Sequence, residues 1–234
     1  MELISKYRKK PERKVIFRPA VAADSPQIAE LFHIASDGVA DYVWSKHAEP
    51  GQSLLEVGSR RYARRATQFS YENCVVGQWN GEVIAMMHSF PISANPVPET
   101  APEPDPVLRP YSELEISGSF YISGMAVAPK HQGNGLGTRM LAIANSQARE
   151  EGALPLSLLA FEENEGAVRL YRAHGFRAVD QRKVVPHPFI RRGGNVLLMA
   201  KESKLTGDDQ PRAGAGQPLK LNQSQGGCTG PWNI

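Results

Sequence analysis

A glycine-rich turn between an expected strand and an expected helix constrains this 234-residue chain more than any other feature. Three glycines fall within five residues, in the run Gln132-Gly133-Asn134-Gly135-Leu136-Gly137. Glycine lets a backbone approach a ligand closely, because it carries no Cβ and permits positive φ. A helix that begins directly behind such a turn points free N–H groups and the positive end of its dipole at one place. The turn predicts a binding site for a pyrophosphate, although similar turns also serve as plain strand-to-helix connections.

Around this turn, the hydrophobic pattern alternates between strand and helix periods and predicts one α/β domain. The expected strands are residues 15–18, 74–78, 82–89, 120–128, 156–161, 177–185 and 195–200. The expected helices are residues 25–35, 54–69, 138–151 and 164–174. Residues 37–51 and the proline-rich residues 91–110 are expected to be loops, because proline is excluded from sheet interiors.

Composition narrows the class of protein. The chain is 41% hydrophobic and 22% charged, as in ordinary globular proteins. Its net charge of +3 comes from the ends, and residues 15–200 are mildly acidic, so we expect no nucleic-acid-binding surface. Two cysteines and no long apolar run favour a reducing compartment, and we expect a cytoplasmic protein without a membrane partner. The scattered histidines predict no metal site.

A second motif follows the glycine-rich turn. Asn164 and Tyr171 lie seven residues apart on one expected helix and therefore share a face. Taken singly, Asn164 is explained as a helix cap and Tyr171 as a core residue. The two motifs together resemble the GNAT superfamily of acyl-CoA-dependent N-acyltransferases, and the second motif consists of Asn164, Ala167, Leu170, Tyr171, Gly175 and Phe176.

The resemblance implies a mixed, splayed, mostly antiparallel sheet flanked by helices, with acetyl-CoA between two parallel strands. It implies an N-acetyltransferase domain at 14–201. The basic residues of 1–13 predict a flexible arm, and the Gly-, Gln-, Ser- and Pro-rich residues 202–234 predict a disordered tail. The resemblance also implies that acetyl-CoA is bound by Asn164 and by the backbone of two segments. The first segment is Met125, Ala126 and Val127, and the second is Gln132, Gly133, Asn134, Gly135, Leu136, Gly137 and Thr138. Tyr171 would act as the general acid on the CoA thiolate.

The general base is open, because the chain departs from the family pattern. Some family members that modify protein termini carry a carboxylate five residues before the matching asparagine, where this chain has Leu159. Glu115 and Glu113, just before the central strand, are the leading candidates, followed by His187. Each of the three is also explained as an exposed loop residue. His88, on an expected strand, is interpreted as a core histidine rather than a base.

We expect a primary amine as acceptor, attacking acetyl-CoA directly. A protein N-terminus or lysine as acceptor, and a non-catalytic acyl-CoA sensor, stay open as alternatives, and so does a homodimer. A dinucleotide-binding fold is disfavoured, because its ribose-binding acidic residue would have to be Glu150 or Glu151, at a helix end instead of a strand end.

Overall fold

The computed structural model describes residues 15–94, 104–152 and 155–202. The expected basic arm, nearly all of the expected tail, and part of the proline-rich loop lie outside these residues. Within the described residues, seven strands form one sheet in the order β1-β2-β3-β4-β5-β7-β6. The strands are β1 (Ile16–Pro19), β2 (Cys74–Trp79), β3 (Glu82–Pro91), β4 (Phe120–Val127), β5 (Leu156–Phe161), β6 (Arg177–Lys183) and β7 (Asn195–Lys201).

Every neighbouring pair of strands is antiparallel except β4 and β5, which run parallel. This arrangement confirms the expected mixed, mostly antiparallel sheet. The β2–β3 hairpin also confirms the prediction from Asn80-Gly81, and Asn80 and Gly81 both have positive φ, as a tight primed turn requires.

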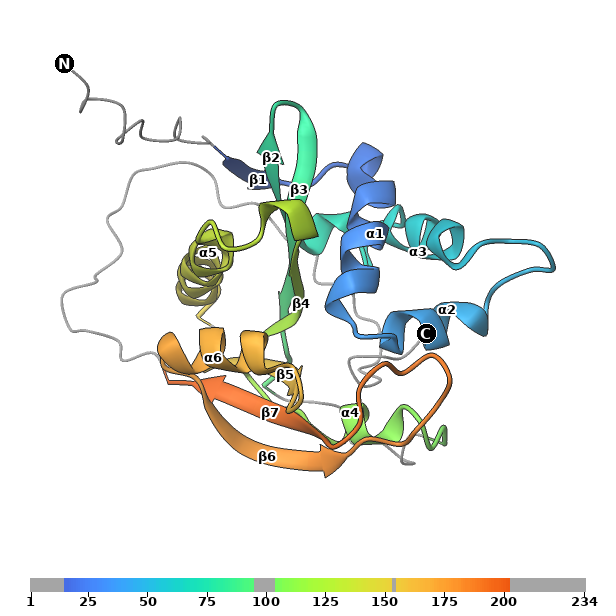
Figure 1. The fold of residues 1–234 in the computed structure, drawn as a ribbon. Coiled ribbons are helices and arrows are strands. Elements are labelled where there is room, and N and C mark those ends of the chain that lie inside the picture. Colours follow the sequence, from blue (N-terminus) through green and yellow to red (C-terminus); the bar gives the residue numbers. More distant parts are fainter. Residues whose placement is uncertain (1–14, 95–103, 153–154, 203–234) are drawn as a thin grey trace, which may run out of the picture.

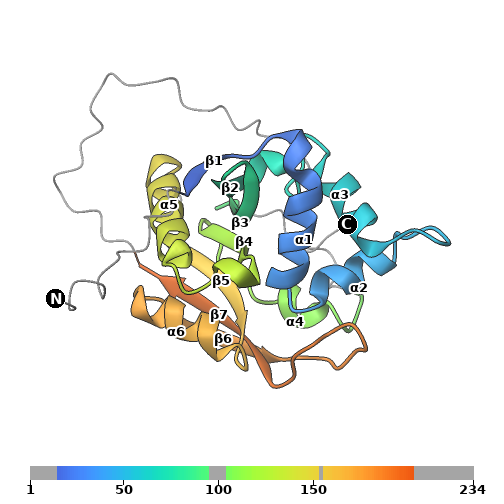
Figure 2. The same ribbon diagram turned by 45° about the horizontal axis from the view of Figure 1, so that its top comes forward.

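Helices cover both faces of the sheet (Figures 1 and 2). One face carries α5 (Leu136–Glu150) and α6 (Glu165–Ala173), and the other carries α1 (Ser25–Ala35), α2 (Val39–Ser45), α3 (Leu54–Tyr62) and α4 (Arg109–Ser112). Neighbouring strand residues alternate between the two cores. Met86 packs with the α1 side and Met87 with the α5 side, for example, and both are fully buried. None of the helices described is long and apolar enough to cross a membrane.

The parallel strands β4 and β5 separate along their length. They pair only from Phe120–Leu156 to Ile122–Leu158, although β4 continues to Val127. A hydrogen bond of 2.7 Å between the hydroxyls of Ser119 and Ser157 lies at the closed end. Opposite the point of divergence, the β3–β4 register shifts between His88 and Ser89, and such bulges bend a strand. Backbone groups of β4 beyond Ile122 therefore have no partner on β5.

Two of the expected segments are wrong. Residues 39–45 form α2 instead of a loop, because Val39, Ala40, Val43 and Trp44 form a buried helical face. The helix expected over residues 54–69 ends at Tyr62. Ala66 adopts φ 54° and donates its N–H to Glu72 Oε2 at 2.8 Å, so the chain leaves the helical path before Phe69 joins the core.

His88 is fully buried among aromatic rings, as its interpretation as a core residue requires. Its ring lies 5.4 Å from Tyr62 and 5.0 Å from Phe69, centre to centre, and Nε2 lies 2.8 Å from the carbonyl of Gln68. Burial lowers the pKa of His88 from 6.5 to about 4.

This buried histidine makes stability depend on pH. A depressed pKa in the folded state means that the contribution is fully present above pH 6.5 and is lost as the pH falls towards 4. We expect about 3 kcal/mol less free energy of unfolding at pH 4.5 than at pH 8 from this group, at about 1.4 kcal/mol per pKa unit. Urea unfolding of the wild type and of His88→Gln at both pH values measures it. An unchanged pH dependence in the variant would contradict the assignment.

Candidate active site

One cavity of about 490 Å³ opens where β4 and β5 separate. Its walls come from the outer half of β4, the glycine-rich turn with the start of α5, the end of β5, and α6. The end of α1 and the residues that follow it close the opposite side. The cavity therefore joins both sequence motifs, the first of which ends at Gly137 and the second of which begins at Asn164.

The glycine-rich turn and the start of α5, residues 133–138, leave room for a ligand beside their backbone and are called the glycine cradle below. Gly133 and Gly135 adopt φ 74° and 72°, and a Cβ built on either residue would meet no atom within 4 Å. Both glycines line the cavity, so their missing side chains leave room for a ligand instead of for packing. Gly135 is the N-cap of the 15-residue helix α5, whose first N–H groups have no intrahelical partner. These features fit a bound pyrophosphate.

The other predicted residues of this turn divide into two groups. Gln132, Leu136, Gly137 and Thr138 line the cavity, whereas Asn134 does not. The Asn134 amide donates to the carbonyls of His131 and Gln132 at 2.9 and 3.1 Å, and so holds the turn. Gly137 permits helix packing, because a Cβ there would lie 2.8 Å from Leu170 Cδ2.

The predicted β4 residues Met125, Ala126 and Val127 also line the cavity. Gln132 Nε2 donates to the carbonyl of Val127 at 3.0 Å, which ties the turn to the end of β4. This bond fixes the distance between the glycine cradle and the unpaired edge of β4.

Tyr171 projects from α6 into the cavity wall and is 8% exposed. Its ring packs against Phe176 with centres 5.9 Å apart. Burial raises the pKa of Tyr171 to about 12, and the negative charge of Asp37 adds to the shift. Tyr171 is therefore a neutral phenol throughout the neutral pH range and is able to donate a proton.

Asn164 caps the N-terminus of α6 and also connects it to Asp37. Its Oδ1 accepts the N–H of Ala167 at 3.2 Å, which begins α6, and its Nδ2 donates to Asp37 Oδ2 at 3.1 Å. An asparagine amide carries two N–H donors, so one remains for a ligand. Asn164 lines the cavity at the position that the resemblance implied.

The structure does not bring the three candidate bases to this cavity. Glu113 is a surface residue whose Oε2 lies 2.9 Å from Arg182 Nε. Glu115 is exposed and absent from the cavity lining. His187 packs on Tyr42 with ring centres 4.4 Å apart and accepts the N–H of Phe189 on Nδ1, also outside the lining.

Sequence reasoning missed Asp37, which lines the cavity just after the end of α1. Arg192 Nε ion-pairs with Asp37 Oδ2 at 2.8 Å, and Arg192 belongs to the loop between β6 and β7. The only signal was the Asp37-Gly38 pair after an amphipathic helix, which indicates a helix end and carries no chemical information.

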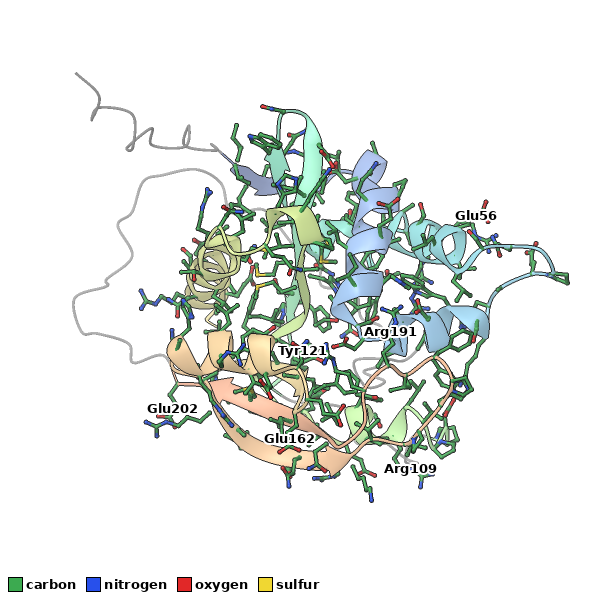
Figure 3. The ribbon with its side chains drawn as sticks, in the orientation of Figure 1. Glu56, Arg109, Tyr121, Glu162, Arg191 and Glu202 are labelled. Carbon is green, nitrogen blue, oxygen red and sulfur yellow. The ribbon has the colours of Figure 1, made fainter. Side chains whose placement is uncertain are left out.

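The loop between β6 and β7 is held against α1 and α2 by a second buried carboxylate. Asp41 accepts from Arg191 at 2.6 Å and contacts His33 Nδ1 at 2.6 Å. Figure 3 shows Arg191 beside the ends of α1 and α2. Asp41 itself is absent from the cavity lining, so this network positions the loop that carries Arg192.

The chain is similar to known proteins in sequence and in fold. Residues 44–176 match the model of the Acetyltransferase (GNAT) family. An uncharacterized N-acetyltransferase of Bacillus subtilis (strain 168), YobR, is 33% identical over 66 residues, which is 28% of this chain and only 27% of the relative.

Two solved structures resemble the fold. An N-acetyltransferase from Staphylococcus aureus Mu50 superimposes with a TM-score of 0.56 at 18% identity, covering 79% of this chain and 99% of that one. The protein yncA from Salmonella typhimurium, solved with its cofactor acetyl-CoA, gives a TM-score of 0.53 at 20% identity, covering 86% and 99%. Because the family model spans more than half of the sequence, this chain belongs to the acetyltransferase (GNAT) family, as its two motifs predicted.

Proposed function

We propose that the protein is an N-acetyltransferase that moves an acetyl group from acetyl-CoA to a primary amine by direct attack. One observation carries the proposal: the glycine cradle, the unpaired edge of β4 and the Tyr171 phenol line the same cavity. The acetyl-CoA bound to yncA supports the same donor for this chain. The cysteine content supports work in a reducing compartment such as the cytoplasm.

The donor site follows from the cavity walls. Amides between Gly133 and Thr138 would hold the pyrophosphate, and backbone groups of Met125, Ala126 and Val127 would bind the arm that carries the acetyl group. Asn164 would donate its remaining N–H to that arm. Acetyl-CoA supplies the acetyl group as a thioester.

Positioning is the main task of such a site, because an amine attacks a thioester without a covalent acyl-enzyme. A backbone N–H between Gly124 and Val127 would stabilise the negative charge that develops on the carbonyl oxygen. Tyr171 would then donate its proton to the departing thiolate sulfur. The raised pKa of Tyr171 keeps that proton in place until the sulfur becomes basic.

The acceptor must lose a proton before or during attack. Glu113 and Glu115 lie away from the cavity lining, so either carboxylate would act only through intervening water. Leu159 lines the cavity at the position where some family members that modify protein termini carry a carboxylate, and this favours a small amine over a protein terminus.

A thiol-release assay tests the proposal. Purified protein is incubated with acetyl-CoA and a panel of primary amines, and free CoA thiol is measured with a chromogenic disulfide. We expect sustained release with at least one amine, together with an acetylated amine by mass spectrometry. Saturable acetyl-CoA binding without release for any amine would instead support the non-catalytic sensor.

A further inference from the structure

Asp37 has an unusual backbone at the cavity wall. Its φ of 47° lies in the left-handed region, which few residues other than glycine occupy, and aspartate and asparagine tolerate best. The next residue, Gly38, packs so closely on the β6–β7 loop that a Cβ would meet the Phe189 carbonyl. Strain of this kind persists where the surroundings fix the residue, and it is concentrated at functional sites.

Three segments of the chain hold Asp37 in place. Arg192 Nε and Asn164 Nδ2 both contact Oδ2, at 2.8 and 3.1 Å, and the N–H of Arg191 donates to the Asp37 carbonyl at 2.9 Å. All of these side-chain contacts converge on one carboxylate oxygen. The other oxygen, Oδ1, accepts no hydrogen bond from the residues described, although a carboxylate offers about four acceptor sites.

The surroundings of this oxygen leave it without a donor within the described part of the chain, although Arg192 pairs with Asp37 through Oδ2. Arg191 is committed to Asp41, and Arg192 also donates to the carbonyl of Glu163 at 3.1 Å. The cavity lining includes the apolar residues Ile34, Val39, Leu159, Phe161 and Val196, together with Tyr111, whose pKa the charge of Asp37 helps to raise. A carboxylate in an apolar wall pairs best with a group that brings both positive charge and N–H donors.

Asp37 also lies near the proposed reaction centre. Its charge contributes to the raised pKa of Tyr171, and Asn164 connects its carboxylate to the start of the helix that carries Tyr171. A group bound to Asp37 would therefore lie in the cavity that Tyr171 also lines.

We infer that Asp37 binds the acceptor as an ammonium ion through its free Oδ1, so the enzyme selects cationic primary amines with an apolar body over neutral molecules of the same shape. The inference rests on the proposed function, because only acetyl transfer makes the bound amine an acceptor. The binding of the amine itself does not require turnover. Asp37 is thus a specificity-determining residue that touches the substrate.

The test compares amines with their alcohol isosteres on the CoA complex. Butylamine and butanol, hexylamine and hexanol, and benzylamine and benzyl alcohol are titrated by ligand-observed NMR. We expect the wild type to prefer each amine by about 10- to 100-fold, the contribution of one charge-assisted hydrogen bond. In Asp37→Asn, which tolerates the same φ, this ratio should fall to near 1 while CoA affinity stays unchanged.

Asp24→Asn is the matched control, because Asp24 is a buried carboxylate, paired with Arg18, that does not line the cavity. It should keep the preference for amines. A wild-type ratio near 1, which needs no variant, would overturn the inference, and so would an unchanged ratio in Asp37→Asn.

Failure of this inference is distinguishable from failure of the proposed reaction. If the wild type prefers amines but releases no CoA thiol with any of them, the reaction is wrong and the ammonium site stands. If thiol is released but Asp37→Asn keeps the amine preference, only the role of Asp37 is wrong.

Discussion

Gly135→Val is expected to weaken acetyl-CoA binding by at least about 100-fold in titration calorimetry. A valine at this N-cap would place its branched side chain in open space on the cavity wall, where the pyrophosphate is proposed to lie. Loss of two amide-to-phosphate hydrogen bonds at about 1.5–3 kcal/mol each is sufficient for this effect. The variant should still fold, because no protein atom lies within 4 Å of the added Cβ.

Gly152→Val is the matched control for backbone strain. Gly152 also has positive φ, 63°, and open space around a built Cβ, but it lies at the far end of α5 and outside the cavity lining. Both variants should lose about 1–2 kcal/mol of stability, the cost of a left-handed residue with a side chain. If Gly152→Val weakened acetyl-CoA binding as much as Gly135→Val, the cradle would be excluded as the site.

Tyr171→Phe should lower kcat by about 10²- to 10⁴-fold and leave acetyl-CoA affinity within about twofold. The change removes only the hydroxyl, so the packing on Phe176 and the cavity wall remain. Stopped-flow or steady-state thiol release gives kcat, and calorimetry gives the affinity. An unchanged kcat would remove Tyr171 from the mechanism.

Tyr121→Phe is the control for loss of a buried phenol. Tyr121 is 2% exposed, and its hydroxyl has no hydrogen-bond partner among the described residues. It is labelled in Figure 3 and does not line the cavity, so its removal should leave kcat unchanged.

The Tyr171 phenol should also remain protonated in alkaline assays. Its pKa of about 12 lies above the ordinary value of 10, so the phenol provides a proton below pH 10 and loses it only as the pH approaches 12. We therefore expect ionisation of Tyr171 to cause no decline of kcat between pH 8 and pH 10. A decline in the wild type that is absent in Tyr171→Phe would contradict this. Spectrophotometric titration of the tyrosinate in wild type and variant gives an independent reading.

The fold was largely predictable because its elements carry local signals. Leu156–Phe161 is a short apolar run typical of a buried parallel strand, and Asn80-Gly81 specifies a hairpin turn. The errors arose where tertiary packing overrides the local pattern. Ala66 continues a helical apolar face in the sequence, yet it takes a left-handed conformation so that Phe69 reaches the core.

The part of the cavity formed by the glycine-rich turn and by Asn164 and Tyr171 was predictable for the same reason, since both are short motifs. Their binding of the donor stays a prediction. The proposed acceptor side was not predictable. Asp37 reaches the cavity only because α1 ends beside α6 and because Arg192 arrives from a loop more than 150 residues later. Glu113 and Glu115 precede β4 in sequence, but the chain places both outside the cavity lining.

The central claim is that backbone groups of the glycine-rich turn bind the diphosphate of coenzyme A. Titration calorimetry of the wild type and of Gly135→Val with acetyl-CoA and with S-acetylpantetheine, which has the same acetylated arm but neither the diphosphate nor the adenosine 3′-phosphate, tests it most directly, because only the diphosphate is proposed to lie at Gly135. The account predicts saturable binding of acetyl-CoA and at least about 100-fold weaker binding of S-acetylpantetheine by the wild type, a difference that Gly135→Val should reduce. Equal affinity for the two ligands, or no saturation with acetyl-CoA in well-folded protein, would contradict it.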